Sequence, residues 1–229
     1  PTISTGKADS INYNVEITEK MYQNAYKRLR PHLGTALTGI YSIRGGKEGG
    51  KPEAHAYQFQ FCLGPDNYVQ YSCVPHYDFP YSNADLKSTY HLSKGFNGGP
   101  GGGFSSCKTC IAPVLNNGDI DSIPELKAAY LLLYNYAAIE NADMFGPMPY
   151  NDFKKNRDES PFKYDDVRTI YYSAKANIDS CVAAFKHFQE RPEWYKSKVV
   201  KYIFINRLPL IKNADLYETE GLQPWIEFA

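Results

Sequence analysis

The stretch that decides the fold is SIPELKAAYLLLYNYAAIENADMFGPMPY, residues 122–150, which predicts one long helix. Ser122 and Glu125 have the spacing of a capping box, in which each side chain satisfies a free amide of the first turn. Pro124 falls in that first turn, where its missing N–H costs little. Gly146 and the prolines that follow it end the helix.

The apolar residues of this stretch recur near helical spacing, and its alanines leave little bulk. A second helix could therefore approach closely. The apolar positions are Leu126, Tyr130, Leu133, Ala137 and Met144, and the small ones are Ala128, Ala129, Ala137 and Ala138.

A second helix is predicted after the polar connection NDFKKNRDES, with Asp165 or Asp166 as its cap. Its apolar stripe runs for roughly 25 residues, or about 37 Å at 1.5 Å per residue. The two helices should pack as a hairpin of the tetratricopeptide type, although one copy does not establish a period. The stripe consists of Val167, Ile170, Tyr171, Ala174, Ile178, Cys181, Val182, Phe185 and Phe188.

The composition sets limits on the class of protein. A chain of 229 residues buries roughly 70–75% of its unfolded surface, so one domain needs no metal or disulfide support. Lys+Arg and Asp+Glu both number 25, which argues against a nucleic-acid partner and against a basic membrane-surface protein. No apolar run is long enough to span a bilayer, and no signal peptide stands at Pro1, although a removed leader leaves no trace.

The remaining segments are less regular. The polar lead, residues 1–12, is expected to be poorly ordered at its end, and residues 13–41 are expected to be helical with a break at Pro31. Residues 54–90 are rich in aromatics and leave strand and helix open, and the glycines of residues 95–103 predict a loop. The last residues, GLQPWIEFA, predict the start of an amphipathic helix, so we expect a fragment of a longer protein.

The 20 tyrosines are the unusual feature of the composition. A tyrosine ring suits both core edges and stacking on sugars or peptides. We assign most of them to packing, particularly those at helical spacing: Tyr130, Tyr134, Tyr171 and Tyr172.

The strings ADMFGPMPYNDF and PFKYDDVRTIYYSAKANID resemble the SusD/RagB family of outer-membrane lipoproteins. The segments YQFQFCLGPDNYVQYS and ADLYETEGLQPWIEFA are similar to further parts of that family, so the resemblance covers most of the chain from Tyr57 onward. It is strongest between Ala128 and Ala184. The matching positions are Asp143, Phe145, Gly146, Pro149, Tyr150, Pro161, Asp165, Ile170 and Tyr171.

The resemblance implies a mostly α fold, in which tetratricopeptide-like helix pairs form an α-α superhelix with long irregular loops. It implies a single SusD-like helical domain over residues 1–229, incomplete at its C-terminus, since family members are commonly near twice this length. Members are anchored to the outer membrane at the cell surface by a lipidated N-terminal cysteine, which this chain lacks. They act with a SusC-like TonB-dependent transporter as its lid, capturing glycans or peptides without chemistry on the ligand.

The predicted ligand site uses aromatic and amide side chains of the loops. Aromatic faces stack on sugar C–H faces while amides bind hydroxyls; the alternative is that these residues pin a long loop to the core. Trp194 and Trp225 lie at predicted helix edges, which weakens the carbohydrate assignment. We expect a glycan ligand, with a peptide second, and a helical-repeat interaction scaffold without small ligand as the rival. The residues are Tyr77, Phe79, Tyr81, Asn83, Phe96 and Asn97.

The cysteines leave three alternatives open. Cys107 and Cys110 form C-x-x-C, and with Cys73 and His76 they could make a Cys3His zinc site. We favour free thiols over a local disulfide, and the disulfide over zinc, and we predict no metal and no cofactor.

Catalysis has weak support in the sequence. The carboxylate pair Asp165–Asp166 suits a helix cap, and Asp119–Asp121 and Asp158–Glu159 suit solvated loops. No histidine has a neighbouring nucleophile arrangement, and GGPGGG lacks the Lys-Ser/Thr ending of a phosphate loop. We therefore predict a binding protein and not an enzyme.

Overall fold

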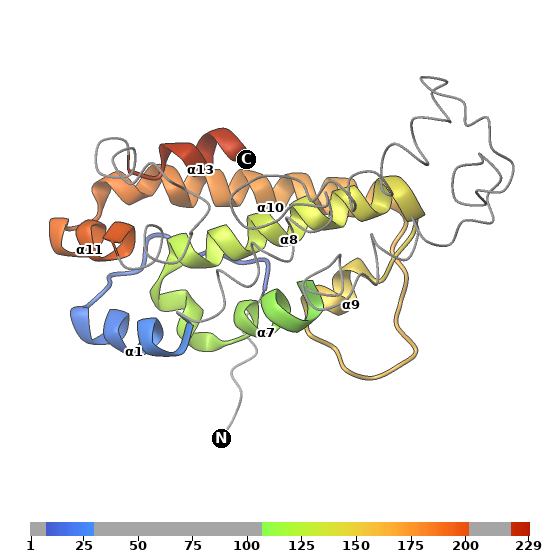
Figure 1. Cartoon of the computed structure of the whole chain (residues 1–229), viewed down its shortest axis with the longest axis horizontal. Helices are drawn as coiled ribbons and strands as arrows, with labels where there is room; N and C mark the ends of the chain where they lie inside the picture. The colour runs from blue at the N-terminus through green and yellow to red at the C-terminus, as the bar shows by residue number, and fades with distance from the viewer. Residues whose placement is uncertain (1–7, 30–106, 202–220) are drawn as a thin grey trace, which may run out of the picture.

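The computed structural model of the chain describes residues 8–29, 107–201 and 221–229, which are mostly helical (Figure 1). Beside the helices, these residues hold an isolated antiparallel bridge between Met148 and Asp165. The prediction of a mostly α fold is confirmed. The helices, with η marking short 3-10 or π-type turns, are α1 (Glu19–Leu29), η2 (Cys107–Ile111), α7 (Ala112–Leu115), η3 (Gly118–Ser122), α8 (Pro124–Phe145), α9 (Tyr150–Lys154), α10 (Val167–His187), η4 (Phe188–Glu190), α11 (Glu193–Lys198) and α13 (Gln223–Phe228).

The start and end of α8 follow from local sequence, with one exception. Pro124 lies in the first turn, and the helix ends at Gly146, whose φ of 77° is a conformation that side chains rarely adopt. The predicted capping box is wrong, because no side chain caps this N-terminus. The Glu125 carboxylate instead accepts hydrogen bonds from Arg191 and Tyr195, so it is engaged away from the free amides of the first turn.

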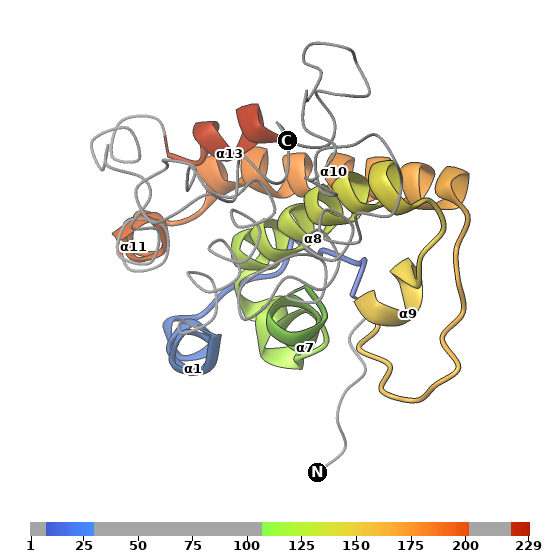
Figure 2. The same ribbon diagram turned by 45° about the vertical axis from the view of Figure 1, so that its right-hand side comes forward.

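The helix α8 is buried on nearly every side. All residues from 123 to 135 are buried, although the sequence predicted only one broad apolar face. One side of α8 packs on α10, and another side contacts α7 and η3 (Figure 2). The helix therefore lies at the centre of the described helices, with its buried polar side chains, among them Glu125 and Asn135, bonded to other residues.

The helix α10 begins as predicted and runs beside α8. Asp166 is its N-cap and accepts a hydrogen bond of 2.7 Å from the Thr169 amide, whereas Asp165 belongs to the bridge before the helix. The predicted apolar stripe is wrong at Tyr171, because this residue is 41% exposed. The stripe otherwise faces the core through Ile170, Ala174, Cys181, Phe185 and, beyond the helix, Phe188.

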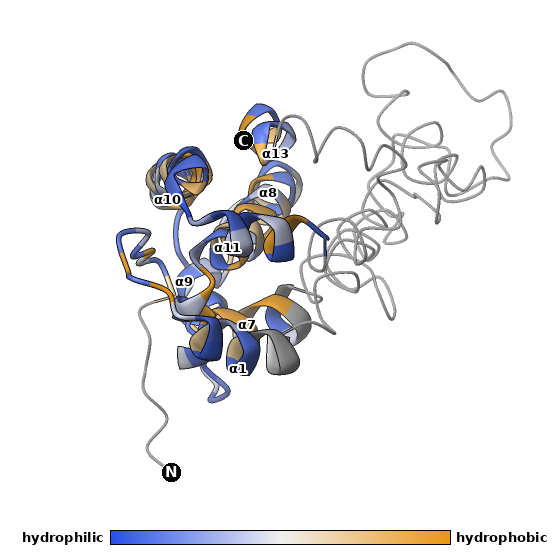
Figure 3. Ribbon diagram, turned by 90° about the vertical axis from the view of Figure 1, so that its left-hand side faces the viewer, coloured by the Kyte–Doolittle hydropathy of each residue, from blue (hydrophilic) through white to orange (hydrophobic). Residues whose placement is uncertain are grey.

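The predicted C-terminal helix is present as α13, which packs on α10. The rings of Trp225 and Phe185 lie 5.9 Å apart and join the two helices. Figure 3, which looks along the long helices, shows α8, α10 and α13 on one side of the molecule and α1 and α7 on the other. Among the described helices, none is both long enough and apolar enough to cross a bilayer.

The chain before α1 is not helical from Tyr13 as predicted: it is irregular, with turns at residues 8–9 and 13–14, and the helix begins only at Glu19. Apolar and polar residues alternate from residue 11 to 18, a period that suits an extended segment on a surface. From Ala8 onward this lead packs against the body, since Ala8 is buried. The segment expected to be helical after Pro31, the aromatic segment 54–90 and the glycine-rich loop lie outside the described residues.

Candidate functional site

The predicted ligand residues lie outside the part of the chain that the structure describes. They remain a prediction: Tyr77, Phe79, Tyr81, Asn83, Phe96 and Asn97. The described residues do contain the helix hairpin and the turn that carry the motif, ADMFGPMPYNDF and the start of α10. These elements form the framework described below.

The turn between α8 and α9 is joined to the segment before α10. Met148 and Asp165 exchange backbone hydrogen bonds of 3.2 and 2.9 Å, and the Asp165 carboxylate accepts a bond of 2.8 Å from the Asn151 amide. Asp165 is buried, at 8% exposure. The carboxylate therefore fixes the start of α9 against the start of α10.

The Tyr150 hydroxyl lies at the centre of a buried polar network between α8, α9 and α10. It donates to Asn135 Oδ1 at 2.5 Å and accepts from Asn177 Nδ2 at 3.1 Å and from Lys154 Nζ at 3.2 Å. The Tyr134 hydroxyl donates to the Tyr150 carbonyl at 2.7 Å. Burial, followed by the charge of Asp9, raises the pKa of Tyr150 well above its ordinary value. The network joins three helices through a neutral hydroxyl.

Lys154 brings a positive charge into this network, and its side chain is fully buried. Its ammonium pairs with Asp9 Oδ1 at 3.1 Å and lies 4.2 Å from the centre of the Tyr150 ring. Burial lowers the pKa of Lys154, and the carboxylate of Asp9 opposes that shift. The ammonium is surrounded by partners, which is the arrangement of a structural cation.

A second buried charge pair connects α8 to the chain around η4 and α11. Glu125 is fully buried and accepts from Arg191 Nε at 3.1 Å and from the Tyr195 hydroxyl at 2.6 Å. Burial, followed by the charge of Glu125, raises the pKa of Tyr195 well above its ordinary value. The first turn of α8 is thereby held by residues about 70 positions away.

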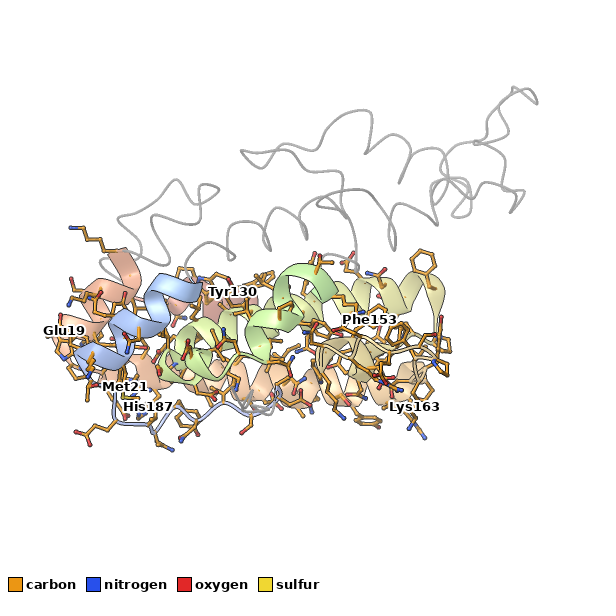
Figure 4. The ribbon with its side chains drawn as sticks, turned by 90° about the horizontal axis from the view of Figure 1, so that it is seen from below. Glu19, Met21, Tyr130, Phe153, Lys163 and His187 are labelled. Carbon is orange, nitrogen blue, oxygen red and sulfur yellow. The ribbon has the colours of Figure 1, made fainter. Side chains whose placement is uncertain are left out.

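The connection between α9 and α10 is fixed by Lys108. Its ammonium lies 4.8 Å from the Phe162 ring centre and 5.4 Å from that of Phe153, and it pairs with Asp158 at 3.6 Å. Cation–π contacts of this kind hold an exposed loop against a helix. Figure 4 shows Phe153 and Lys163 at the same end of the molecule.

Exposed tyrosines occur at this end of the hairpin, which the sequence reasoning missed. Tyr164 is 64% exposed and Tyr172 is 68% exposed, and the Tyr171 hydroxyl donates to Asp143 on α8, which raises the pKa of Tyr171. The assignment of Tyr171 and Tyr172 to packing is wrong. The signal was present in the sequence, because Arg168 stands four residues before Tyr172 on the solvent side of α10.

The described residues show structural partners for the predicted carboxylate pairs. Asp166 caps α10, Asp165 accepts the Asn151 amide, and Asp121 pairs with Lys127 at 2.6 Å.

Metal ligands do not cluster in the described part of the chain, where no group of three or more His, Cys, Asp or Glu could hold an ion. Cys181 is a buried free thiol whose pKa burial raises. The side chains of Cys107 and Cys110, together with Cys73 and His76, lie outside what the structure describes. The alternatives for the C-x-x-C pair therefore stay open.

The fold and the framework define a helical protein in which paired long helices hold a turn in place by buried hydrogen bonds. Residues 10–208 match the SusD-like family, described as SusD and RagB outer membrane lipoprotein. The chain belongs to the SusD/RagB family, which is a family of binding proteins. No curated protein and no solved structure matches the chain.

Proposed function

We propose that the protein is a cell-surface binding protein that captures oligosaccharides and delivers them to a SusC-like TonB-dependent transporter of the outer membrane. The family match over residues 10–208 is the observation that supports this proposal. In it, the protein is held at the surface by a lipid anchor outside this chain and performs no chemistry on its ligand.

The ligand in this proposal contacts the aromatic loops and not the motif. The buried groups around Tyr150 and Glu125 have their hydrogen-bonding capacity occupied by other side chains, so they suit a framework and not a ligand site. In the proposed binding mode, the sugar stacks on aromatic rings while side-chain amides hydrogen-bond its hydroxyls. The residues are Tyr77, Phe79, Tyr81, Phe96, Asn83 and Asn97.

A protein-interaction scaffold is the second candidate, and the exposed tyrosines favour it. Tyr164 and Tyr172 present large apolar faces at one end of a rigid hairpin, and tyrosine is enriched at protein interfaces. A peptide-binding member of the same family is the third possibility, since peptides also stack on aromatic rings.

Isothermal titration calorimetry with a panel of oligosaccharides and short peptides tests these functions. It is run on this chain and on a longer version extended past Ala229. Tyr77→Ala or Tyr81→Ala should abolish binding, whereas Tyr172→Ala, which removes an exposed tyrosine outside the loops, should leave it unchanged. Loss on Tyr172→Ala alone moves the site to the hairpin. If neither version binds any oligosaccharide or peptide of the panel, the scaffold function is favoured.

A further inference from the structure

Residues 8–18, here called the strap, run without helix along the flank of the helical body and lead into α1, as Figure 4 shows near the labelled Met21 and His187. Half-buried residues alternate with exposed ones along residues 11–18. No backbone–backbone hydrogen bond joins residues 8–17 to another described segment. The polar attachments of the strap are therefore made by side chains of the body.

The first attachment is Lys154. Its side chain is fully buried, whereas its partner Asp9 on the strap is 47% exposed, and the two charged atoms lie 3.1 Å apart. A buried ammonium without a partner is costly. Asp9 thus covers and neutralises a charge that belongs to the body.

The second attachment is Arg191. Its two terminal nitrogens donate to the carbonyls of Tyr13 at 2.6 Å and of Val15 at 2.8 Å, while Nε donates to Glu125. The Tyr13 ring lies 5.3 Å from that of His187, at the end of α10. One planar guanidinium therefore holds two strap carbonyls and the first turn of α8 together.

We propose that the strap is a detachable latch, which leaves the helical body as one unit when either cation loses its hold, while the α8–α10 hairpin stays folded. A segment with few polar attachments and no backbone ladder belongs to the least stable parts of a fold, whereas α8 and α10 supply most of the buried core residues. Loss of one attachment leaves the strap held by the other cation and by the packing of Ala8, Ile11, Tyr13 and Ile17 on the body, and we expect the two attachments to open together.

Release of the strap would lengthen the free chain on the N-terminal side of the helical body. Eleven extended residues span at most about 36–40 Å. Release of the strap therefore adds up to that length between the body and whatever precedes residue 8. This consequence rests on the proposed function, since the added length matters for a protein anchored to a membrane through its N-terminal side.

Two probes test the latch on the full chain. The first is acetylation of Lys154 by acetic anhydride, measured by peptide mass spectrometry, and the second is chymotrypsin cleavage after Tyr13. Arg191→Lys keeps a charge beside Glu125 but loses the fork that reaches both carbonyls, and it should raise Lys154 acetylation at least fivefold. Asp9→Asn should raise cleavage after Tyr13 at least fivefold.

The matched control is Glu193→Gln, which removes an exposed carboxylate that pairs with Lys196 within α11 and leaves both strap attachments in place. It should change both rates less than twofold. The proposal would be overturned if Asp9→Asn raised only Lys154 acetylation and Arg191→Lys raised only cleavage after Tyr13. The two ends of the strap would then open independently. A parallel rise in cleavage after Tyr172 on α10 would also overturn it, because the hairpin would be unfolding. Neither readout involves a ligand. A negative result for the latch can therefore be told apart from a negative result for the proposed binding function, which the calorimetry tests.

Discussion

Replacement of Tyr150 by phenylalanine tests whether the buried network holds the hairpin together. Tyr150→Phe removes one oxygen atom and keeps the ring, which packs 5.6 Å from the Tyr134 ring and beneath the Lys154 ammonium. The missing oxygen had three partners: Asn135, Asn177 and Lys154.

The expected cost follows from what each partner has left. A buried group left without its hydrogen bond costs about 1–3 kcal/mol, and a charged one more. Asn177 keeps a contact of 3.4 Å with Asn135, and Lys154 keeps Asp9, so the three losses are partly compensated. We expect Tyr150→Phe to lower the free energy of unfolding by about 2–4 kcal/mol.

Urea denaturation followed by circular dichroism measures this change. The matched control is Tyr172→Phe, the same substitution at a 68% exposed ring, which should stay within about 0.5 kcal/mol of the unchanged protein. A cost below about 1 kcal/mol for Tyr150→Phe would refute the reasoning, because the network would then add little beyond packing.

Three further changes probe the buried charge pair, the turn and the buried titratable groups. Arg191→Met leaves the Glu125 carboxylate buried without its cation and should cost about 3–5 kcal/mol, whereas the double variant with Glu125→Gln should cost less; urea denaturation compares them, and an equal or larger cost contradicts the pairing. Gly146→Ala forces a side chain to φ +77° and should cost about 1–3 kcal/mol by the same assay, and a cost below about 0.5 kcal/mol would contradict the strain assigned to this position. Burial raises the pKa of Cys181 and of Tyr195, so the folded state keeps protons that the unfolded state releases. The resulting stability is fully present below about pH 9 for Cys181 and below about pH 10 for Tyr195, and it is lost above those values by up to about 1.4 kcal/mol per pH unit for each group. Lys154, whose pKa burial lowers, opposes this loss only below about pH 10.5, and a stability that rises between pH 9 and 10 would contradict the expected loss.

The two long helices could be predicted from sequence because their signals are local. Pro124, Gly146 and Asp166 act within a turn of their own positions, and the structure places each at the expected helix end. The helical spacing of the apolar residues in α10 likewise reports which side faces α8.

The misassigned residues depend on partners that are distant in sequence. Glu125 suits a capping box by spacing, but Arg191, 66 residues later, binds its carboxylate. The segment before Glu19 has a partly helical composition, but the Arg191 guanidinium binds two of its carbonyls, which a helix would use for its own hydrogen bonds. No local pattern contains that information.

Three residues that carry the family resemblance serve the framework. Gly146 supplies a turn conformation, Tyr150 joins three helices, and Asp165 fixes one helix start against another, all from buried or half-buried positions. Because each is engaged by the chain itself, exchanging ligands between family members would not require them to change. The motif therefore identifies the scaffold, and ligand choice has to come from residues outside it. That is why a strong resemblance between Ala128 and Ala184 leaves the ligand open, and why the substitutions proposed to test binding are those at Tyr77 and Tyr81.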